Sequence, residues 1–188
     1  MVSYWLPSTS LFFGHLMKPL NPFEPYIQAM TRLVGQAYGE PALLDAAEPL
    51  LSELIASDRW LPEAYAVASE KTYQQYWPYC DPLARFSVVS FVWGPGQKTP
   101  IHDHKVWGLI GVLRGAERGH HLGHDVLPVS HALPDQVTSR IQMYGADIGR
   151  VKCHGFEENS LAEREFDSGY EDYPPLMSST PASQSSVF

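Results

Sequence analysis

The chain changes character near residue 85, and this change constrains its fold more than any other feature. Residues 21–59 carry apolar side chains at helical spacing, whereas later runs are rich in β-branched and aromatic residues. The run RFSVVSFVW, residues 85–93, ends at the turn sequence GPG, which is typical of a strand followed by a turn. Helices followed by consecutive short strands predict a mainly β fold, a barrel with an N-terminal helical cover.

The helical cover is expected over residues 21–80. Asn21 and Pro22 resemble an N-cap followed by proline at the first helical position. Pro41 and Pro49 are expected to divide the region into short helices, and KTYQQYW, residues 71–77, is interpreted as a further helical turn. A buried helical face is predicted for Leu43, Ala47, Leu50, Leu51, Leu54 and Ile55.

The strand-rich part is expected over residues 85–173, so that 21–173 form a single domain. Further strands are predicted within 102–113, 116–122 and 136–148. Residues 1–20 are interpreted as a flexible lead, because they lack a basic leading segment and are interrupted by Pro7. The Ser/Pro-rich residues 174–188 are expected to be a disordered tail.

Charge and cysteine content narrow the class of protein. The net charge of −8 over 188 residues argues against nucleic acid or an anionic membrane surface as a partner. Two cysteines do not make a disulfide framework, so a reducing, cytoplasmic setting is expected. The sequence leaves the oligomeric state open.

Two histidines stand one residue apart in GQKTPIHDHKVWGLIGVLRG, residues 96–115. Alternate residues of a strand share one face, so His102 and His104 can converge on one ion while Asp103 points away. Neutral imidazole suits Fe, Zn, Cu and Ni. The competing interpretation is two ordinary strand or surface histidines.

The spacing of the flanking glycines resembles the first conserved motif of the cupin superfamily. The motif positions are Gly96, His102, His104, Gly108 and Gly115. Cupins are small double-stranded β-helix barrels with a metal inside, and most members carry a glutamate ligand where this chain has glycine at position 108. The absence of that glutamate is characteristic of the thiol dioxygenases, which hold non-haem Fe(II) with three histidines.

A longer resemblance surrounds this motif. Residues 81–117 are similar to the bacterial cysteine dioxygenase and 3-mercaptopropionate dioxygenase family, and the similarity extends over about residues 21–170 through WLPEAYA, YQQYWPYCD, QMYGADIG and FDSGY. The resemblance implies a cupin-like barrel that uses Fe(II) and O2 to oxidise a small thiol acid, such as cysteine or 3-mercaptopropionate, to a sulfinate.

The third histidine of that family has no direct counterpart here. Its aligned position falls on Leu127, and leucine does not bind metal. His131 shares the strand parity of that position, four strand residues further on, and is the candidate third ligand. His124, and one of the consecutive His120 and His121, are weaker candidates.

The resemblance also places a Ser-x-His-x-Tyr array beside the iron, which here reads Arg140, Gln142 and Tyr144. The Tyr144 phenol is expected to hydrogen-bond substrate or O2. Gln142 can hydrogen-bond but does not exchange protons near neutral pH. Arg140 puts a charge where a small hydroxyl is expected. Tyr144 and Gln142 are therefore the predicted catalytic residues.

The family's mercaptopropionate enzymes bind the substrate carboxylate with an arginine late in the barrel, and that position falls on Cys153. Arg150 and Lys152 lie nearby and are predicted substitutes, with Gln75 as an upstream candidate. A lysine would make a point-charge contact and lose the bidentate fork of an arginine.

Relative to the family, the chain is short between residues 119 and 126, by roughly twenty to thirty residues at usual strand and loop lengths. Missing strands would open the barrel wall. The alternative functions are therefore a catalytically impaired cupin pseudoenzyme or metal-binding module, and a cupin that has changed its chemistry. A third metal ligand distinguishes an active site from a two-histidine module.

Overall fold

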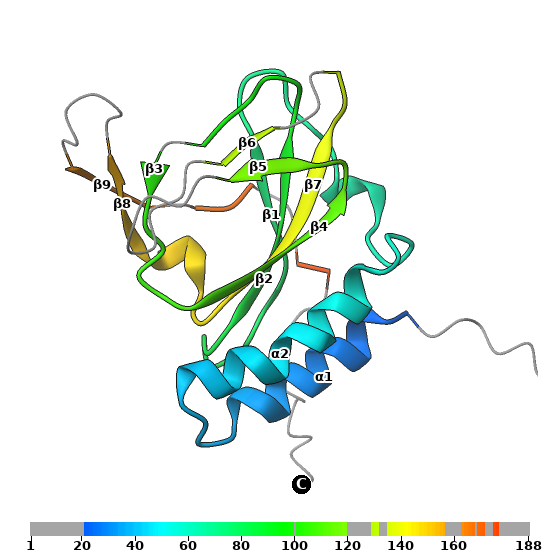
Figure 1. Cartoon of the computed structure of the whole chain (residues 1–188), viewed down its shortest axis with the longest axis vertical. Coiled ribbons are helices and arrows are strands. Elements are labelled where there is room, and N and C mark those ends of the chain that lie inside the picture. The colour runs from blue at the N-terminus through cyan, green and yellow to red at the C-terminus, as the bar shows by residue number, and fades with distance from the viewer. Residues whose placement is uncertain are drawn as a thin grey trace, which may run out of the picture.

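The protein consists mainly of antiparallel β-sheets with two helices (Figure 1). The computed structural model describes residues 21–99, 101–119, 129–131, 135–156, 163–167, 169–171 and 175–176. Within these residues, no helix is long and apolar enough to cross a membrane.

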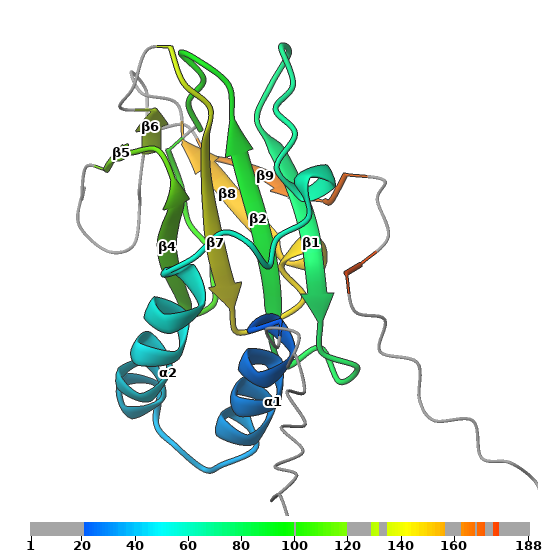
Figure 2. The ribbon, with the colours of Figure 1, turned by 90° about the vertical axis from the view of Figure 1, so that its right-hand side faces the viewer.

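The main sheet has four strands in the order β1 (Gln74–Cys80), β2 (Ser87–Trp93), β7 (Thr138–Tyr144) and β4 (Gly108–Arg114). All neighbours pair antiparallel, and the strands lie side by side in Figure 2. β2 and β7 occupy the middle and are buried at every position. Both faces of this sheet are therefore covered along its two central strands.

Two smaller sheets complete the β structure. One has the order β3 (Ile101–His102), β8 (Lys152–Phe156) and β9 (Glu163–Asp167), and the other pairs β5 (Glu117–Gly119) with β6 (Val129–His131). Short 3-10 helices at Glu63–Tyr65 and Ile148–Arg150 lead into β1 and β8.

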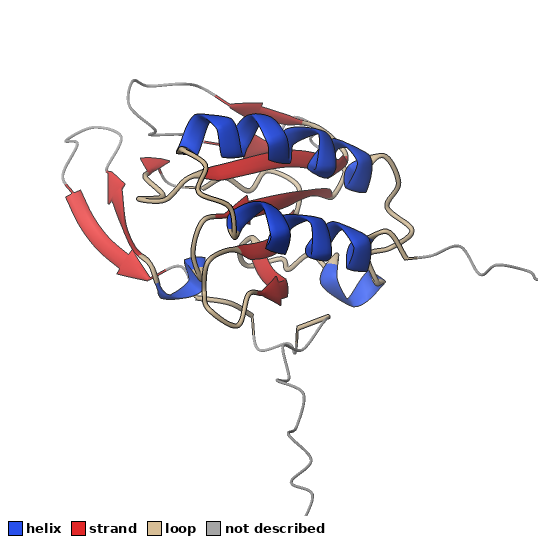
Figure 3. Cartoon of the chain, turned by 90° about the horizontal axis from the view of Figure 1, so that it is seen from below, coloured by secondary structure: helices blue, strands red, loops and turns tan. Residues whose placement is uncertain are grey.

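Helices α1 (Phe23–Val34) and α2 (Glu40–Ile55) lie next to each other against one face of the main sheet, as Figure 3 shows. The backbone N–H of Phe23 donates to the Asn21 side chain at 3.0 Å, but the N-cap position of α1 is Pro22, one residue later than the sequence predicted. The helices and the sheet bury an apolar core between them, to which α2 contributes Leu51 and Leu54.

The predicted helix break at Pro49 is wrong, because α2 runs without interruption from Glu40 to Ile55. Pro49 lies on the exposed side of α2, so the carbonyl that loses its helical partner faces water. Pro41, by contrast, begins the helix, where its missing N–H costs nothing.

The expected helical turn at residues 71–77 is also wrong, and with it the upper end of the helical cover at residue 80. Residues 74–80 form β1. Pro78 is compatible with this strand because β1 lies at the sheet edge and its register shifts between Tyr76 and Tyr79. Pairing with β2 thus overrides the local sequence pattern.

A second core fills the other face of the main sheet. Val89, Phe91 and Trp93 from β2 and Tyr144 from β7 pack there with Cys153 of β8. The sheet containing β3, β8 and β9 therefore faces the side of the main sheet opposite the helices. We call this side the inner face and the helix-covered side the outer face.

The predicted flexible lead, residues 1–20, lies outside the described residues. Of the predicted tail, residues 175–176 are described, and Leu176 packs against the outer core. Both cysteines are free, as expected from the absence of a disulfide framework.

Candidate metal centre

His102 and His104 converge at the inner face. β3 ends at His102, and the chain turns so that the Nε2 atoms of the two rings lie 3.0 Å apart. Two nitrogens that are each about 2.1 Å from one ion lie about 3.0 Å apart when they subtend a right angle. The spacing of the two rings therefore fits two ligands of one transition-metal ion.

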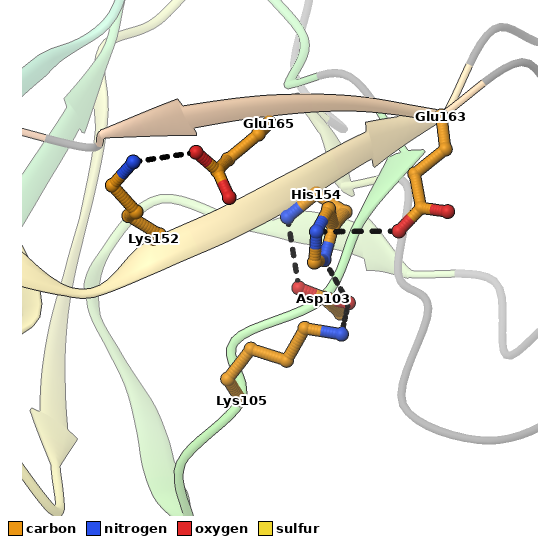
Figure 4. A network of polar contacts seen from close by, with 6 residues as sticks. All are labelled: Asp103, Lys105, Lys152, His154, Glu163 and Glu165. Atoms are coloured by element: carbon orange, nitrogen blue, oxygen red, sulfur yellow. Dashed lines mark hydrogen bonds and ion pairs between the residues drawn. The ribbon is translucent and has the colours of Figure 1, made fainter.

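Asp103, between the two histidines, turns toward β8 and holds this segment in place (Figure 4). The backbone N–H of His154 donates to Asp103 Oδ1 at 3.0 Å, and the Asp103 N–H donates to the His154 carbonyl at 3.1 Å. Lys105 Nζ lies 2.7 Å from Asp103 Oδ2. Burial acts to raise the pKa of the Asp103 carboxyl, but the contact with Lys105 and, after it, the bonds from His154 hold this pKa below its usual range. The ionised carboxylate fixes the turn that presents both imidazoles.

His104 is neutral at physiological pH. Burial above all, with the neighbouring His102 and the charge of Arg140, lowers its pKa to about 4. A neutral imidazole keeps a lone pair on Nε2 for a metal ion. The local environment thus favours the ligand form of this side chain.

Tyr144, on β7, lies against the pair formed by His102 and His104. Its hydroxyl oxygen is 3.4 Å from His104 Nε2, and the two rings meet edge to face at 5.0 Å between centroids. Complete burial raises the pKa of the Tyr144 phenol, so it stays protonated and can donate a hydrogen bond.

Gly108 is the residue opposite Tyr144 in the β4–β7 register. A Cβ added at Gly108 would lie 3.3 Å from Cδ1 of the Tyr144 ring. A larger side chain there would compete with the phenol for the same space. Gly108 therefore lies directly beside the ring of Tyr144.

Gln142 links Tyr144 to Arg140 along the inner face of β7. The Gln142 amide contacts the Tyr144 hydroxyl on one side and Arg140 Nε and Nη2 on the other. A guanidinium only donates hydrogen bonds, so the amide oxygen faces Arg140 and the amide nitrogen faces the tyrosine oxygen. Hydrogen bonds thus run from the histidine pair through Tyr144 and Gln142 to Arg140.

Arg140 is the site residue whose role the sequence pattern missed. It is 1 % exposed, and its guanidinium carbon lies 4.3 Å from the ring centroid of Trp93 and 5.1 Å from that of Phe91. The alternation that places Tyr144 and Gln142 inward also places Arg140 inward, and that signal was available in the sequence.

Of the predicted substrate-binding residues, Arg150 and Lys152 lie at the surface, whereas Gln75, opposite Phe91 in the β1–β2 register, lies on the inner face. The Arg150 side chain is 88 % exposed and pairs with Asp147 at 3.2 Å. Lys152 is 65 % exposed, and its ammonium lies 2.6 Å from Glu165, on the outside of β8 (Figure 4). Gln75 is buried, and its amide donates to the Gly169 carbonyl at 2.8 Å. The structure brings neither Arg150 nor Lys152 to the histidine pair.

His131, the predicted third ligand, lies on β6 opposite Glu117 of β5, and its side chain is outside the description. His120, His121, His124 and Leu127 also lie outside the described residues. Among the residues described, no group of three or more His, Cys, Asp or Glu side chains is arranged to hold a metal ion. Within the described part of the chain, the geometry brings two imidazoles together, and a third ligand at His131 stays a prediction.

The arrangement combines two converging imidazoles, a protonated phenol and a buried guanidinium on one sheet face. Such a set can hold a divalent metal ion and donate hydrogen bonds to a ligand beside it. No protein-family model matches the chain.

Proposed function

We propose that this protein is a thiol dioxygenase-like enzyme of the cupin type, which holds Fe(II) through His102 and His104. The observation that carries the proposal is the 3.0 Å separation of the two Nε2 atoms beside the Tyr144 hydroxyl. Nitrogen donors from imidazole suit ferrous iron. The glycine at position 108, in place of a carboxylate ligand, supports a histidine-only donor set.

The proposed fold is a double-stranded β-helix barrel with strands missing between β5 and β6. The main sheet and the sheet containing β3, β8 and β9 would form its two walls, with the polar cluster between them. The exposed apolar residues Ile110 and Val112 support an open wall, because both lie on the inner face of β4.

The proposed reaction converts RSH and O2 into RSO2H. Sulfur is oxidised, O2 is reduced, both oxygen atoms form bonds to sulfur, and the thiol proton is retained in the sulfinic acid. Bound Fe(II) would supply a site at which thiolate and O2 exchange electrons. The thiol substrate is a small acid such as cysteine or 3-mercaptopropionate.

The residues of the chain have separate roles in this proposal. His102 and His104 hold the metal, and His131 is the proposed third ligand. Tyr144 donates a hydrogen bond to a ligand beside the pair, and Gln142 orients the Tyr144 hydroxyl. The packed aromatic residues of the inner core exclude water from this side of the sheet.

One observation favours the alternative of a catalytically impaired metal-binding module. Gln142 is a neutral amide, and it holds the position from which an acid–base residue would reach Tyr144. A positioned acid–base group contributes about 10²–10⁴-fold to rate. Slow turnover with retained metal binding would identify the module.

The deciding experiment loads the purified protein with Fe(II) under anaerobic conditions. Metal content is measured first, and O2 uptake and sulfinate formation are then followed with cysteine, 3-mercaptopropionate and mercaptosuccinate. We expect bound iron and sulfinate formation with at least one thiol, and loss of both in the His102→Ala/His104→Ala double variant. Iron binding without sulfinate would establish the module, and absence of iron binding by the folded protein would refute both functions.

A further inference from the structure

We propose that the outer edge of strand β4 pairs antiparallel with the same strand of a second copy of this chain, so that the protein forms a two-fold symmetric dimer. The main sheets of the two copies would then join into one continuous sheet. The interface needs neither metal nor substrate, so this inference goes beyond the proposed function and does not depend on it.

The first support is the position of β4 at one edge of the main sheet (Figure 2). On one side β4 pairs with β7, and among the strands that the structure describes, none pairs with its other side. A strand at a sheet edge presents a row of backbone N–H and C=O groups to which another extended strand can hydrogen-bond. The edge of β4 therefore offers a template for strand addition.

The opposite edge of the same sheet is protected against such pairing. Pro78 lies within β1 and has no backbone N–H, and the pairing of β1 with β2 shifts between Tyr76 and Tyr79. A later segment of the chain also hydrogen-bonds to β1, because the Glu171 N–H donates to the Gln75 carbonyl at 2.9 Å. Proline, irregular pairing and contact with a loop are the usual means by which sheet edges avoid association.

Most of β4 lacks such protection. Between Gly108 and Val112 the strand contains no proline and no charged side chain, and its pairing with β7 is regular. The pairing shifts only between Val112 and Arg114, near the end of the strand. Ile110 is 42 % exposed and Val112 is 40 % exposed, although both side chains are apolar. A regular, uncharged and partly exposed apolar edge is the kind of strand that pairs with another chain.

The composition of β4 favours a second β4 as the partner strand. In a two-fold pair, one patch serves both copies, so it must be complementary to itself. Whether Ile110 or Gly111 lies on the axis, residues 109–113 of each copy face uncharged residues of the other. Arg114, the only charged residue of β4, then lies opposite the uncharged start of the partner strand. No like charges meet, and apolar β-branched residues gather across the pair, which stabilises it.

The charge at the end of the strand is compensated within one chain. Arg114 Nε lies 2.9 Å from Asp58 Oδ2, and Arg114 Nη1 lies 3.2 Å from Glu63 Oε2. The interface therefore carries little charge, whereas the whole chain carries −8. Salt screens the repulsion between two acidic copies. The dissociation constant of the dimer should therefore fall as the salt concentration rises, which is opposite to the behaviour of an interface held by ion pairs.

The pairing would also cover the exposed side of the inner face. In the strand register, Ile110 lies next to Gln142, and Val112 lies next to Arg140. A strand added to β4 would place its own inward side chains beyond Ile110 and Val112 on the same face. The second copy would thus supply the part of the wall that β4 leaves exposed to water.

Sedimentation equilibrium of the metal-free, full-length protein at several concentrations tests the dimer. We expect a species of twice the mass of one chain. Ile110→Lys should raise the dissociation constant by about 100-fold or more, because like charges then meet across the axis. Its circular dichroism spectrum should stay unchanged, since Ile110 is partly exposed. Leu83→Lys, at a leucine that is 74 % exposed between β1 and β2, is the matched control and should leave the dimer intact.

A mixture of two variants assigns the contact to β4. Ile110→Glu should also dissociate the dimer, and an equimolar mixture of Ile110→Lys and Ile110→Glu should restore a heterodimer, because opposite charges then lie across the axis. In a separate measurement, Ile110→Cys should form a disulfide-linked dimer under mild oxidation, whereas Leu83→Cys should not. Both results require the two β4 strands to lie side by side.

Other outcomes would overturn the inference. A protein that stays monomeric at every concentration, or a dimer that Ile110→Lys leaves intact, would remove β4 as the interface. A monomer that binds a synthetic peptide with the sequence of β4 would assign the edge to a strand from another protein. Dimer formation by a protein that makes no sulfinate would support the interface and count against the proposed enzyme alone.

Discussion

The two faces of the main sheet are built from the same strands but carry different chemistry. On the outer face, Val88, Val92, Ile141 and Met143 pack against α1 and α2 in an apolar core. On the inner face, the alternate positions of β7 are Arg140, Gln142 and Tyr144. Both faces are fully buried along β7, so the difference lies in what is buried and not in how much.

The two faces are expected to differ in their contributions to folding stability and to ligand binding. Burial of apolar side chains between helices and sheet stabilises the fold by about 25 cal/mol for each Å² removed from water. Burial of a guanidinium and a glutamine contributes little or costs stability unless every hydrogen bond is made. The outer face is therefore expected to carry folding stability, and the inner face to carry the ligand site.

The largest expected effect belongs to the inner face. His102→Ala removes one of the two converging imidazoles and should lower Fe(II) affinity by more than about 100-fold, beyond the usual cost of losing a residue that orients a ligand. The free energy of unfolding of the metal-free protein should fall by about 1–2 kcal/mol, because His102 is buried but lies at a strand end. Metal titration and urea unfolding measure both quantities, and unchanged iron affinity would contradict the metal centre.

The outer face should show the opposite pattern. Ile141→Ala leaves a cavity at a fully buried position and should lower the free energy of unfolding by about 2–5 kcal/mol. Iron affinity of the folded fraction should stay the same. Val112→Ala is the control, because Val112 is exposed on the inner face and its loss should cost less than about 0.5 kcal/mol. An equal decrease in the free energy of unfolding in Ile141→Ala and Val112→Ala would contradict the distinction between the two faces.

Acid should destabilise the metal-free protein through His104. Burial lowers the His104 pKa in the folded protein to about 4, from an ordinary value near 6.5. Between these values the unfolded chain binds a proton that the folded protein does not, so stability falls as pH drops from about 6.5 to 4. We expect a loss of about 1–3 kcal/mol, measured by urea unfolding at several pH values. His104→Asn should flatten this part of the profile, and a profile identical to that of the unmodified protein would contradict the depressed pKa.

The smallest expected effect belongs to Asp103, which holds the turn between His102 and His104. Asp103→Asn retains the shape of the side chain but removes its negative charge. That charge attracts Lys105 and strengthens the hydrogen bond that the carboxylate accepts from the His154 N–H. Iron affinity should fall by about tenfold, because the turn between the two histidines is held less firmly. Asp135→Asn, at an exposed aspartate, is the matched control for metal titration. A decrease as large as that of His102→Ala would instead make Asp103 a ligand.

Much of the fold could be read from the sequence, for reasons of periodicity. The runs that became β2 and β7 combine β-branched and aromatic residues between turn sequences, and the helical spacing around Leu43 and Leu54 predicted the buried face of α2. His102 and His104 converge as expected, but not through strand alternation, because β3 ends at His102 and the chain turns before His104. The sequence alone predicts which way a side chain points where that direction depends only on residues nearby in the chain.

Tertiary structure decided what periodicity could not. Residues 74–80 form a strand because β2 offers an edge to pair with. Pro49 is tolerated within α2 because the carbonyl that it leaves without a hydrogen-bond donor faces water. Arg140 was recognised in the sequence as a charge in an unusual place, but its stacking on Trp93 depends on a neighbouring strand. Arg150 and Lys152 were close to the site in sequence, yet ion pairs with Asp147 and Glu165 hold them at the surface. The sequence by itself determined which residues share a face; the pairing of distant strands decided which charge is buried beside the histidines, because burial depends on the whole fold.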